Sequence, residues 1–565
     1  MTVTRPCYLT ELPAEILEEI LSYLHPCLIA QCRILNRALK LIVESSIELQ
    51  LRIELGIDGY IMEWPLPAVI SAHEMLKVVQ KRRLAFETGT PFTTWTLDAP
   101  QQSQYEISNG VLGYGILPSS SGYNGIRYEN LYPTSKSKRE DANHNKEPGK
   151  EIILGDGLTP RVADFSFSFD DNLQVLVSVL SPDETRTIYF RTIDTNEPHP
   201  QAASTQIVLK PRDGILRTRC LTLLSHSHIS FALYASNAPV LHVIYNWRTG
   251  DYALPYQNVD DIAFLNEHFA LLLLNSTDYI GLSVYNLDRK QVIRRLKLPF
   301  RSVLRSAYFI TGPPKRARSP SNGKENPFES MTFDPKVEVI GLQLTATNEG
   351  PRGYHAYGVI SIDGLLRKMR SPSDINLDID QHDAYMRQSS APTAEQGLEG
   401  VDIQWDEWGP PVMRWFDDGD IFDASFRSIS GSRFLVRQRR KDKSGALSRR
   451  RNVVCILEFN LRSEVRSGYI HSRDNEATAY NEARTVGTKV VRAETVIKIN
   501  EGGTGHAFNV LSSLPYRVID LPSIPSEPYY DYYLDGNTVL GRDDTRYDIY
   551  SFCPSGVRQL EDNGD

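Results

Sequence analysis

The chain begins with apolar residues that recur every three or four positions. Residues at this spacing share one face of an α-helix. Pro13 suits a first helical turn, where a backbone N–H has no intrahelical partner, and His25-Pro26 would end the helix. The pattern therefore predicts a short amphipathic helix whose apolar stripe consists of Leu12, Ile16, Leu17, Ile20, Leu21 and Leu24.

The next segment, from Leu28 to Val43, is apolar or small on almost every side. A helix of that kind must be covered on more than one face. Ser45 followed by Glu48 has the spacing of a capping box and predicts a further helix that ends at Gly56 or Gly59. These short helices have too little chain to bury all of their apolar surface.

Two blocks near the N-terminus, LPAEILEEILSYL and CLIAQCRILNRALKLI, are separated by a proline-containing break. This arrangement resembles an F-box. The continuation SSIELQLRIELGIDGY is similar to the version common in fungal F-box proteins, where a helix follows the box directly. The resemblance covers the first 60 residues well and reaches more loosely to about residue 85. The chain departs from the family at Leu39, where a bulky aromatic residue is usual.

The resemblance implies a docking module. F-boxes bind a Skp-type adaptor, which connects to a cullin in an SCF ubiquitin ligase, and an amphipathic helix in an apolar groove is a recurring recognition mode. The alternative is that the stripe is the internal core of a helical domain. The docking interpretation assigns the adaptor contact to Leu12, Pro13, Ile16, Leu17, Ile20, Leu21, Leu24, Leu28, Ile29 and Leu35.

Residues 61–90 are predicted to form a helical linker. Ser71 and Glu74 form a second capping box that opens a helix through Phe86. The basic residues on this helix are expected to form a solvated face: Lys77, Lys81, Arg82 and Arg83.

After about residue 90 the pattern changes to short strands of alternating or continuous apolar residues. A buried strand followed by a tight polar turn occurs at 245–251 and again at 285–290, about 40 residues later, which is the length of a four-stranded propeller blade. The pattern resembles a degenerate β-propeller over 91–555, without regular GH and WD signatures. Two β-sandwiches or barrels are the alternative.

The predicted fold class is therefore multi-domain, with F-box helices at 8–60 before the linker and the all-β region. Three polar, Pro/Ser-rich insertions are expected to be loops, at 134–150, 311–330 and 368–399. Residues 556–565 form an acidic tail.

Two basic runs, 315–318 and 437–451, could be nuclear-import signals or anion-binding patches. We favour solvated loops or hairpin tips, because short basic motifs match by chance often. An aromatic group in the second half could anchor a partner or pack between blades, and we favour packing. Its members are Trp405, Trp408, Trp415 and Phe416.

A formal net charge of −8 argues against a general nucleic-acid binder. No run reaches the roughly 18 apolar residues of a membrane span, and no secretory signal pattern is visible. The scattered cysteines then predict reduced thiols in a cytoplasmic or nuclear protein.

Catalytic chemistry has little support in the sequence. The glycine-rich segment 501–506 lacks the Lys-Ser/Thr pair of a phosphate loop, and His226 and His228 lack a carboxylate partner motif. We expect no catalytic residues, cofactor or metal. The prediction is a non-enzymatic substrate-recognition adaptor of an SCF ubiquitin ligase that presents an unidentified protein. The alternative is a propeller scaffold for protein–protein interactions without a role in ubiquitin transfer.

Overall fold

The computed structural model describes most of the 565 residues. The described residues are 12–62, 70–98, 105–108, 110–119, 122–131, 150–153, 161–179, 185–209, 220–225, 227–235, 238–253, 259–276, 279–300, 304–312, 331–346, 354–369, 401–417, 421, 423–425, 427–441, 450–462, 488–500, 507–527 and 529–554. The segment 501–506, His226 and residues 556–565 lie outside this part, as does most of each predicted insertion.

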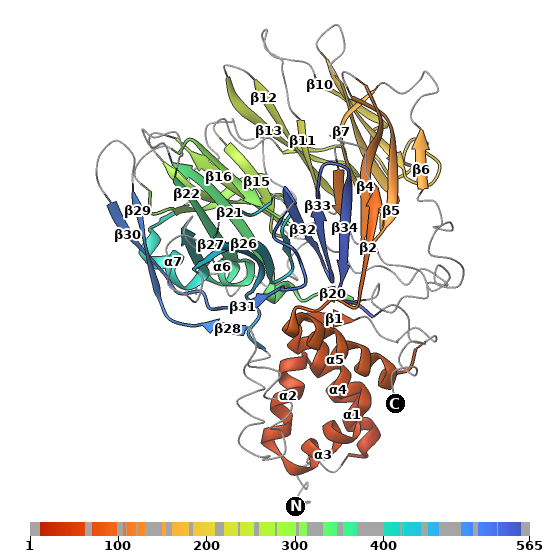
Figure 1. The fold of residues 1–565 in the computed structure, drawn as a ribbon, viewed down its shortest axis with the longest axis vertical. Coiled ribbons are helices and arrows are strands. Elements are labelled where there is room, and N and C mark those ends of the chain that lie inside the picture. Colours follow the sequence, from red (N-terminus) through yellow and green to blue (C-terminus); the bar gives the residue numbers. More distant parts are fainter. Residues whose placement is uncertain are drawn as a thin grey trace, which may run out of the picture.

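The N-terminal helices form a module at one end of the molecule, with the sheets stacked beyond it (Figure 1). Their apolar stripes meet in a small core that contains Leu39, Val43, Leu49 and Ile53. The helical module consists of five helices: α1 (Ala14–Ser22), α2 (Pro26–Leu35), α3 (Arg37–Ser45), α4 (Ile47–Ile57) and α5 (Ala72–Thr88).

Three predicted details of these helices were wrong. The single helix over 28–43 is two helices, because Asn36 adopts an extended conformation and its Oδ1 accepts the Ala38 N–H at 2.7 Å. The cap of α4 is Ser46 rather than Ser45, and Ser46 Oγ accepts the Leu49 N–H. Pro13 is the N-cap of α1 rather than a first-turn residue. Each error concerns a polar residue that competes locally for backbone groups, or a boundary one residue away.

The capping box at Ser71 and Glu74 is confirmed. Ser71 Oγ accepts the Glu74 N–H, and Glu74 Oε2 accepts the Ser71 N–H at 2.9 Å. The helix ends at Gly89, whose φ of +64° lies in the left-handed region that glycine favours. No helix in the described part of the chain is long and apolar enough to cross a membrane.

The strand-rich region is a succession of seven antiparallel sheet units among the described residues. Among the described residues, the strands of units 1 and 2 pair with each other only at Tyr123 and Val162. The first four units are: unit 1, β3 (Tyr105–Ser108), β4 (Val111–Ser119), β5 (Gly122–Asn130) and β6 (Lys150–Ile153); unit 2, β7 (Val162–Ser168), β8 (Leu173–Ser178), β9 (Arg186–Thr192) and β10 (Gln206–Leu209); unit 3, β11 (Cys220–Ser225), β12 (His228–Ala235), β13 (Ala238–Asn246) and β14 (Tyr252–Ala253); unit 4, β15 (Val259–Phe264), β16 (Phe269–Asn275), β17 (Ile280–Asn286) and β18 (Gln291–Lys297), with β23 (Val401–Ile403) added in parallel.

The last three units follow the same order, except that the final one borrows a strand from the start of the region. They are: unit 5, β19 (Ser306–Ile310), β21 (Val339–Ala346), β22 (Tyr354–Ser361) and β24 (Met413–Asp417); unit 6, β25 (Ile429–Ser430), β26 (Arg433–Lys441), β27 (Arg450–Glu458) and β31 (Tyr516–Asp520), with β28 (Thr488–Val491) on β31; unit 7, β32 (Asp531–Asp535), β33 (Thr538–Arg542), β34 (Arg546–Ser551) and β2 (Thr93–Asp98).

Buried clusters lie between successive units and close them into a ring. One pair from each cluster illustrates the order, from units 1 and 2 round to units 7 and 1: Tyr128 and Phe167, Phe190 and Phe231, Ile244 and Leu272, Leu282 and Phe309, Tyr357 and Phe434, Ile456 and Leu534, Leu540 and Leu112. β2 pairs with β34 from Thr93 opposite Ser551 to Asp98 opposite Arg546. The chain's last sheet is thus completed by its first long strand, which confirms the predicted propeller and excludes two separate sandwiches.

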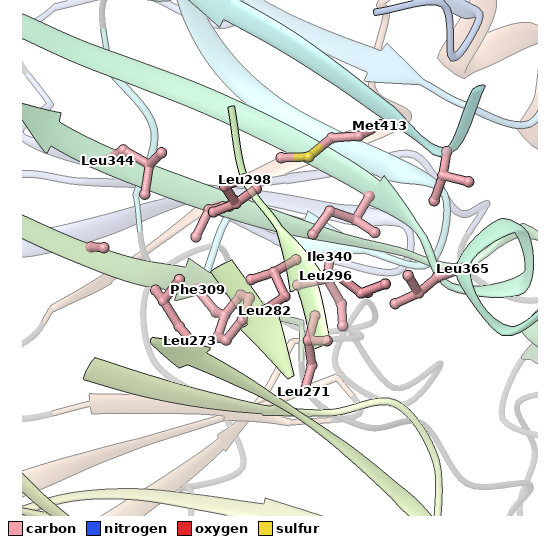
Figure 2. Close-up of a cluster of buried hydrophobic side chains, with 14 of the residues drawn as sticks. Leu271, Leu273, Leu282, Leu296, Leu298, Phe309, Ile340, Leu344, Leu365 and Met413 are labelled. Carbon is pink, nitrogen blue, oxygen red and sulfur yellow. The ribbon is translucent and has the colours of Figure 1, made fainter. Parts of the chain in front are cut away.

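The largest cluster joins units 4 and 5 (Figure 2) and includes Leu271, Leu282, Phe309 and Leu344. Two short helices, α6 (Ile362–Met369) and α7 (Trp405–Val412), and the hairpin β29 (Thr495–Asn500) and β30 (Ala507–Ser512) contribute to it. The predicted packing role of the aromatic group is confirmed for all of its members: Trp405, Trp408 and Trp415 in this cluster, and Phe416 in the next.

Candidate functional site

The first four helices expose an unusual amount of apolar surface. Half of the sixteen large hydrophobic side chains that are exposed in the described residues lie between positions 16 and 47. They are Ile16, Ile20, Tyr23, Leu28, Ile34, Leu35, Leu41 and Ile47. An exposed apolar concentration of this kind marks an interaction site more often than a chance surface. We call these eight residues the apolar face.

The apolar face on α1 follows from helix geometry. Ile16, Ile20 and Tyr23 are spaced by four and three residues, so they share one side of the helix. Leu17 and Leu21 occupy the other side and are 2% and 3% exposed. One helix therefore serves two surfaces, an internal core and a solvent-facing stripe.

The structure divides the ten predicted contact residues accordingly. Exposed positions are Pro13, Ile16, Ile20, Leu28 and Leu35; Leu12 and Leu24 are half-buried; Leu17, Leu21 and Ile29 are buried. Leu21 and Ile29 belong to the core of the helical module, together with Leu39 and Val43. The buried residues support the shape of the apolar face, and a partner that docks on the module in this arrangement meets the exposed ones.

Polar contacts fix the helices that carry the apolar face. Arg52 of α4 donates from Nη1 to the Ser22 carbonyl at 2.6 Å, which satisfies an acceptor at the end of α1. Ser46 donates to the Glu18 carboxylate of α1. Arg33 and Glu44 join α2 to α3 at 3.0 Å on the surface.

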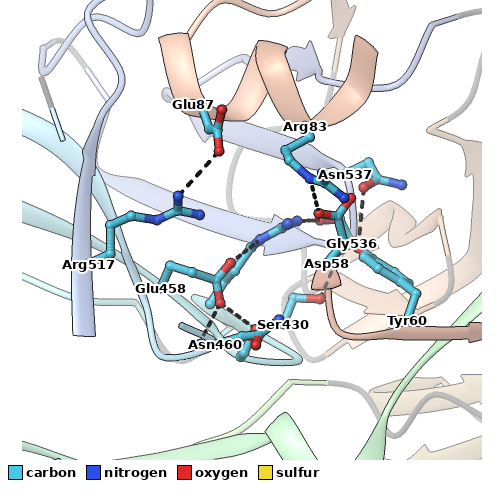
Figure 3. Close-up of polar contacts among 12 residues, drawn as sticks. Asp58, Tyr60, Arg83, Glu87, Ser430, Glu458, Asn460, Arg517, Gly536 and Asn537 are labelled. Atoms are coloured by element: carbon cyan, nitrogen blue, oxygen red, sulfur yellow. Dashed lines mark hydrogen bonds and ion pairs between the residues drawn. The ribbon is translucent and has the colours of Figure 1, made fainter. Parts of the chain in front are cut away.

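The helical module is anchored to the ring of sheets by a buried polar junction (Figure 3). Asp58 accepts from Arg82 Nη2 at 2.7 Å and from Arg83 Nε at 2.5 Å, and Arg83 also reaches Glu54 at 2.6 Å. Burial alone would raise the pKa of the Asp58 carboxyl, but the two guanidinium groups hold it below its usual value. The prediction of a solvated basic face was wrong for Arg82, which is 0% exposed, and for Arg83, because their carboxylate partners lie in the preceding helix and its cap.

The same junction continues into sheet units 6 and 7. The Phe86 ring stacks on Phe552, with centroids 4.5 Å apart, and the Arg433 guanidinium lies 4.0 Å from the Phe86 centroid. Arg433 is itself paired with Glu458 at 2.8 Å. Tyr60 donates to the Asn537 side chain at 3.3 Å. These contacts fix the helical module against one face of the ring.

A second anchor lies where β1 (Tyr60–Met62) pairs with β20 (Met331–Phe333). Asp334 lies between β20 and a short 3-10 helix, η4 (Pro335–Val337). Its Oδ2 atom accepts a hydrogen bond from Arg462 Nη1 at 2.7 Å and lies 3.2 Å from His25 Nε2. Burial would raise the Asp334 pKa, but the Lys336 N–H, Arg462 and His25 together lower it. Asn460 donates to the Ile57 carbonyl at 2.9 Å.

Other predicted candidates add no site within the described residues. No group of three or more His, Cys, Asp or Glu side chains in that part of the chain is placed to hold a metal ion. The segment 501–506, His226 and the basic run 315–318 are outside it. His228 Nε2 lies within hydrogen-bond distance of Asn246 Nδ2, at 3.4 Å, and the His228 ring packs beside Phe264. These contacts are those of a structural histidine.

Sequence comparison bears on the helices that carry the apolar face. The F-box domain family matches residues 9–50, which include α1, α2 and α3. Residues 9–50 are an F-box domain. No curated protein sequence matches the chain. An F-box implies, in general terms, a role as an adaptor of an SCF-type ubiquitin ligase.

Solved structures similar to the chain include propeller-type domains. The WD40 domain of SCAP from fission yeast is 9% identical, with a TM-score of 0.35, over 81% of this chain and 99% of that one. The N-terminal domain of Nup159 is 9% identical, with a TM-score of 0.32, over 87% and 93%. Hydrazine synthase from Kuenenia stuttgartiensis is 10% identical, with a TM-score of 0.35, over 82% and 99%. The ring itself rests on the strand order and the clusters described above.

Sequence reasoning missed the junction. Its carboxylates and arginines come from α4, α5 and the ends of strands β26 and β27. In the second anchor, Asp334 and Arg462 are separated by 128 positions. The available signal was the pairing of Glu54 and Asp58 with Arg82 and Arg83 on two adjacent helices. Charges of opposite sign on facing helices predict an ion pair, but their burial depends on the sheets that cover them.

Proposed function

We propose that this protein is a non-catalytic substrate receptor of an SCF ubiquitin ligase. The apolar face of the F-box docks on a Skp-type adaptor, which links it to a cullin, and the ring of sheets binds the protein to be ubiquitinated. The observation that carries the proposal is the concentration of exposed apolar side chains on an F-box whose own core is already complete. Without a partner this surface would remain in contact with water at a cost in free energy.

The division of residues supports docking through a preformed face. Ile16 and Ile20 are exposed while their neighbours Leu17 and Leu21 are buried, so the partner-binding stripe does not require the core to open. Interfaces that are present before binding avoid the cost of ordering. The buried junction then holds the bound substrate in a defined orientation to the adaptor.

The test is affinity capture of the full chain with quantitative mass spectrometry. The paired change Leu12→Ala and Pro13→Ala alters the start of α1, where Leu12 is half-buried and Pro13 exposed. We expect loss of Skp-type adaptor and cullin from the captured material, while proteins bound to the ring remain. Val496→Ala with Leu511→Ala is the control, because these two residues are exposed apolar partners on the hairpin β29–β30, far from the F-box in sequence.

Capture of adaptor and cullin at the wild-type yield by the Leu12 and Pro13 variant would contradict this use of the stripe. If no cullin accompanies the wild-type chain while other proteins do, the result favours the scaffold function, in which the ring binds partners without directing ubiquitin transfer. A cytoplasmic location, a nuclear location or both are proposed with the receptor function.

A further inference from the structure

An arginine at one end of sheet unit 7 faces tyrosines instead of an acid. Arg542 is the last residue of β33 and is half-buried. Its Cζ atom lies 4.9 Å from the centroid of the Tyr105 ring and 5.9 Å from that of the Tyr547 ring. The Tyr533 hydroxyl accepts a hydrogen bond from it. Because a guanidinium is always charged in a protein, this end of the sheet unit holds a permanent positive charge among aromatic rings.

The acid placed to neutralise Arg542 is engaged elsewhere. Asp531 lies directly opposite Arg542 in the register of β32 and β33. Its Oδ1 atom accepts from Ser425 Oγ at 3.1 Å, and its Oδ2 atom accepts from Tyr533 Oη at 3.0 Å. Among the described residues, neither Asp531 nor any other carboxylate forms an ion pair with Arg542. The guanidinium therefore keeps donors for an acceptor outside this part of the chain.

A buried hydroxyl beside Arg542 also lacks a partner. Tyr547 lies opposite Arg542 in the register of β33 and β34 and is 1% exposed. Its Oη atom makes no hydrogen bond in the described part of the chain. Burial raises the pKa of this hydroxyl, so it remains a donor at neutral pH. Because an unpaired buried hydroxyl costs free energy of folding, its place beside a cation without an acid points to a missing acceptor.

These residues lie on the side of unit 7 that is remote from the F-box. Strand β33 begins at Thr538, next to Asn537, which accepts from Tyr60 of the helical module. Arg542 lies further along the strand, roughly 16 Å from Asn537 at about 3.3 Å per residue. Tyr105 belongs to β3, so the site is shared by the last and the first sheet units. A partner bound at Arg542 therefore leaves the apolar face of the F-box free.

We propose that Arg542, Tyr547 and Tyr105 form a binding site for a single carboxylate of a protein partner, with the guanidinium as its main donor. The planar fork of arginine pairs with a carboxylate through two parallel hydrogen bonds. One cation matches one negative charge, and Asp531 across the strand pair disfavours the second charge of a phosphate group, which is usually bound by clusters of arginines. The inference rests on the proposed receptor function and deepens it by naming the chemistry of the bound protein.

The experiment measures binding of short immobilised peptides to the purified full chain by surface plasmon resonance, without adaptor or cullin. All peptides share one neutral sequence. The first has a central Glu and an amidated C-terminus, the second has Gln at that position and a free C-terminal carboxylate, the third has Gln and is amidated, and the fourth has phosphoserine and is amidated. We expect the first or the second peptide to bind at least about tenfold more tightly than the third. The first two peptides distinguish a side-chain carboxylate from a chain end.

Substitutions at Arg542 test its role as the main donor. Arg542→Gln should abolish the preference for a carboxylate peptide over the neutral one. Arg542→Lys should keep part of the preference, because it retains the charge without the planar fork. Arg546→Gln is the control and should bind like the wild type, since Arg546 is an exposed arginine of the same sheet unit that already pairs with Asp543 at 3.0 Å.

Tyr547→Phe separates a binding role from a structural one. The change removes a buried hydroxyl without a partner, so we expect the unfolding temperature to stay the same or rise while the carboxylate peptide binds more weakly. Tyr550→Phe on the same strand is the control, because Tyr550 Oη pairs with Tyr529 Oη at 2.9 Å. This control should lower the unfolding temperature and leave peptide binding unchanged.

Equal binding of the carboxylate and neutral peptides by the wild type, or an unchanged preference in Arg542→Gln, would overturn the proposal. Tighter binding of the phosphoserine peptide than of either carboxylate peptide would also overturn it. A lower unfolding temperature for Tyr547→Phe with unchanged binding would overturn the role of that hydroxyl. Adaptor capture is measured separately on the same variants and should be unchanged, so a failure at Arg542 is distinguishable from a failure of the F-box docking.

Discussion

The Phe86 side chain at the end of α5 lies flat against Phe552, with an angle of 14° between the rings. Phe552 directly follows β34, the strand that pairs with β2 to close the ring. The contact therefore joins the F-box module to the closing sheet unit. Helical module and ring share a core in which Phe86 and Ala85 pack against Leu435 and Ile456.

We expect Phe86→Ala to lower the free energy of unfolding by about 3–5 kcal/mol, because it removes a buried aromatic side chain and leaves a cavity. Chemical denaturation followed by circular dichroism measures the change. Phe92→Ala is the control, since Phe92 is 42% exposed. A loss below about 1 kcal/mol at Phe86 would show that the module is only loosely attached.

The buried carboxylate at the junction gives a second prediction. Asp58→Asn removes the charge that Arg82 and Arg83 both contact, and breaking a buried pair in this way typically costs about 3–5 kcal/mol. Glu44→Gln, which alters the exposed pair with Arg33, should cost less than about 1 kcal/mol. Urea denaturation at pH 7 compares them. Equal effects of the two substitutions would contradict the assigned importance of the junction.

The low pKa of Asp58 also sets a pH dependence. A carboxyl whose folded pKa lies below its unfolded value of about 3.9 contributes stability that is complete well above that pH and lost as the pH falls through the folded pKa. The difference in unfolding free energy between wild type and Asp58→Asn should therefore shrink below about pH 4. A difference that stays constant down to pH 2 would contradict the low pKa.

Asp261 of β15 is predicted to act in the opposite sense. Burial raises the pKa of its carboxyl to about 7, although the Phe309 and Ile262 N–H groups oppose the rise. Because the folded state then binds the proton more tightly, Asp261 should make the protein less stable as the pH rises from about 4 to about 7. Asp261→Asn should flatten this part of the stability curve, measured by urea denaturation at several pH values. An unchanged slope would contradict the raised pKa.

The sequence predicts local features that depend on neighbouring residues, and it misses those that depend on distant ones. The helical stripe, the box at Ser71 and the spacing of strand pairs all follow from short-range periodicity. The closing pair of Thr93 with Ser551 could be expected only as a general property of propellers. The burial of Arg82 depends on an ion pair and on sheets that the sequence pattern does not bring together.

The predicted adaptor-binding residues illustrate the same limit. Periodicity places Ile16 and Leu17 in one apolar stripe, but only the packing of α1 on α3 and α4 shows that Leu17 is internal and Ile16 exposed. The apolar stripe of α1 is wide enough to contribute both to the internal core and to the exposed apolar face. Which half meets a partner depends on the fourth helix, whose Leu49 and Ile53 complete the core.

The most direct test of the central claim is the dissociation constant of the purified chain for a Skp-type adaptor, measured by isothermal titration calorimetry. The few residues at the centre of an interface that carry most of the binding energy each cost more than about 1 kcal/mol when truncated to Ala, and we assign Ile16 and Ile20 to this group. Ile16→Ala with Ile20→Ala should therefore weaken binding at least about tenfold without lowering the unfolding temperature, whereas Val496→Ala with Leu511→Ala should leave it unchanged. Equal dissociation constants for the wild type and the Ile16 and Ile20 variant would contradict docking through the apolar face.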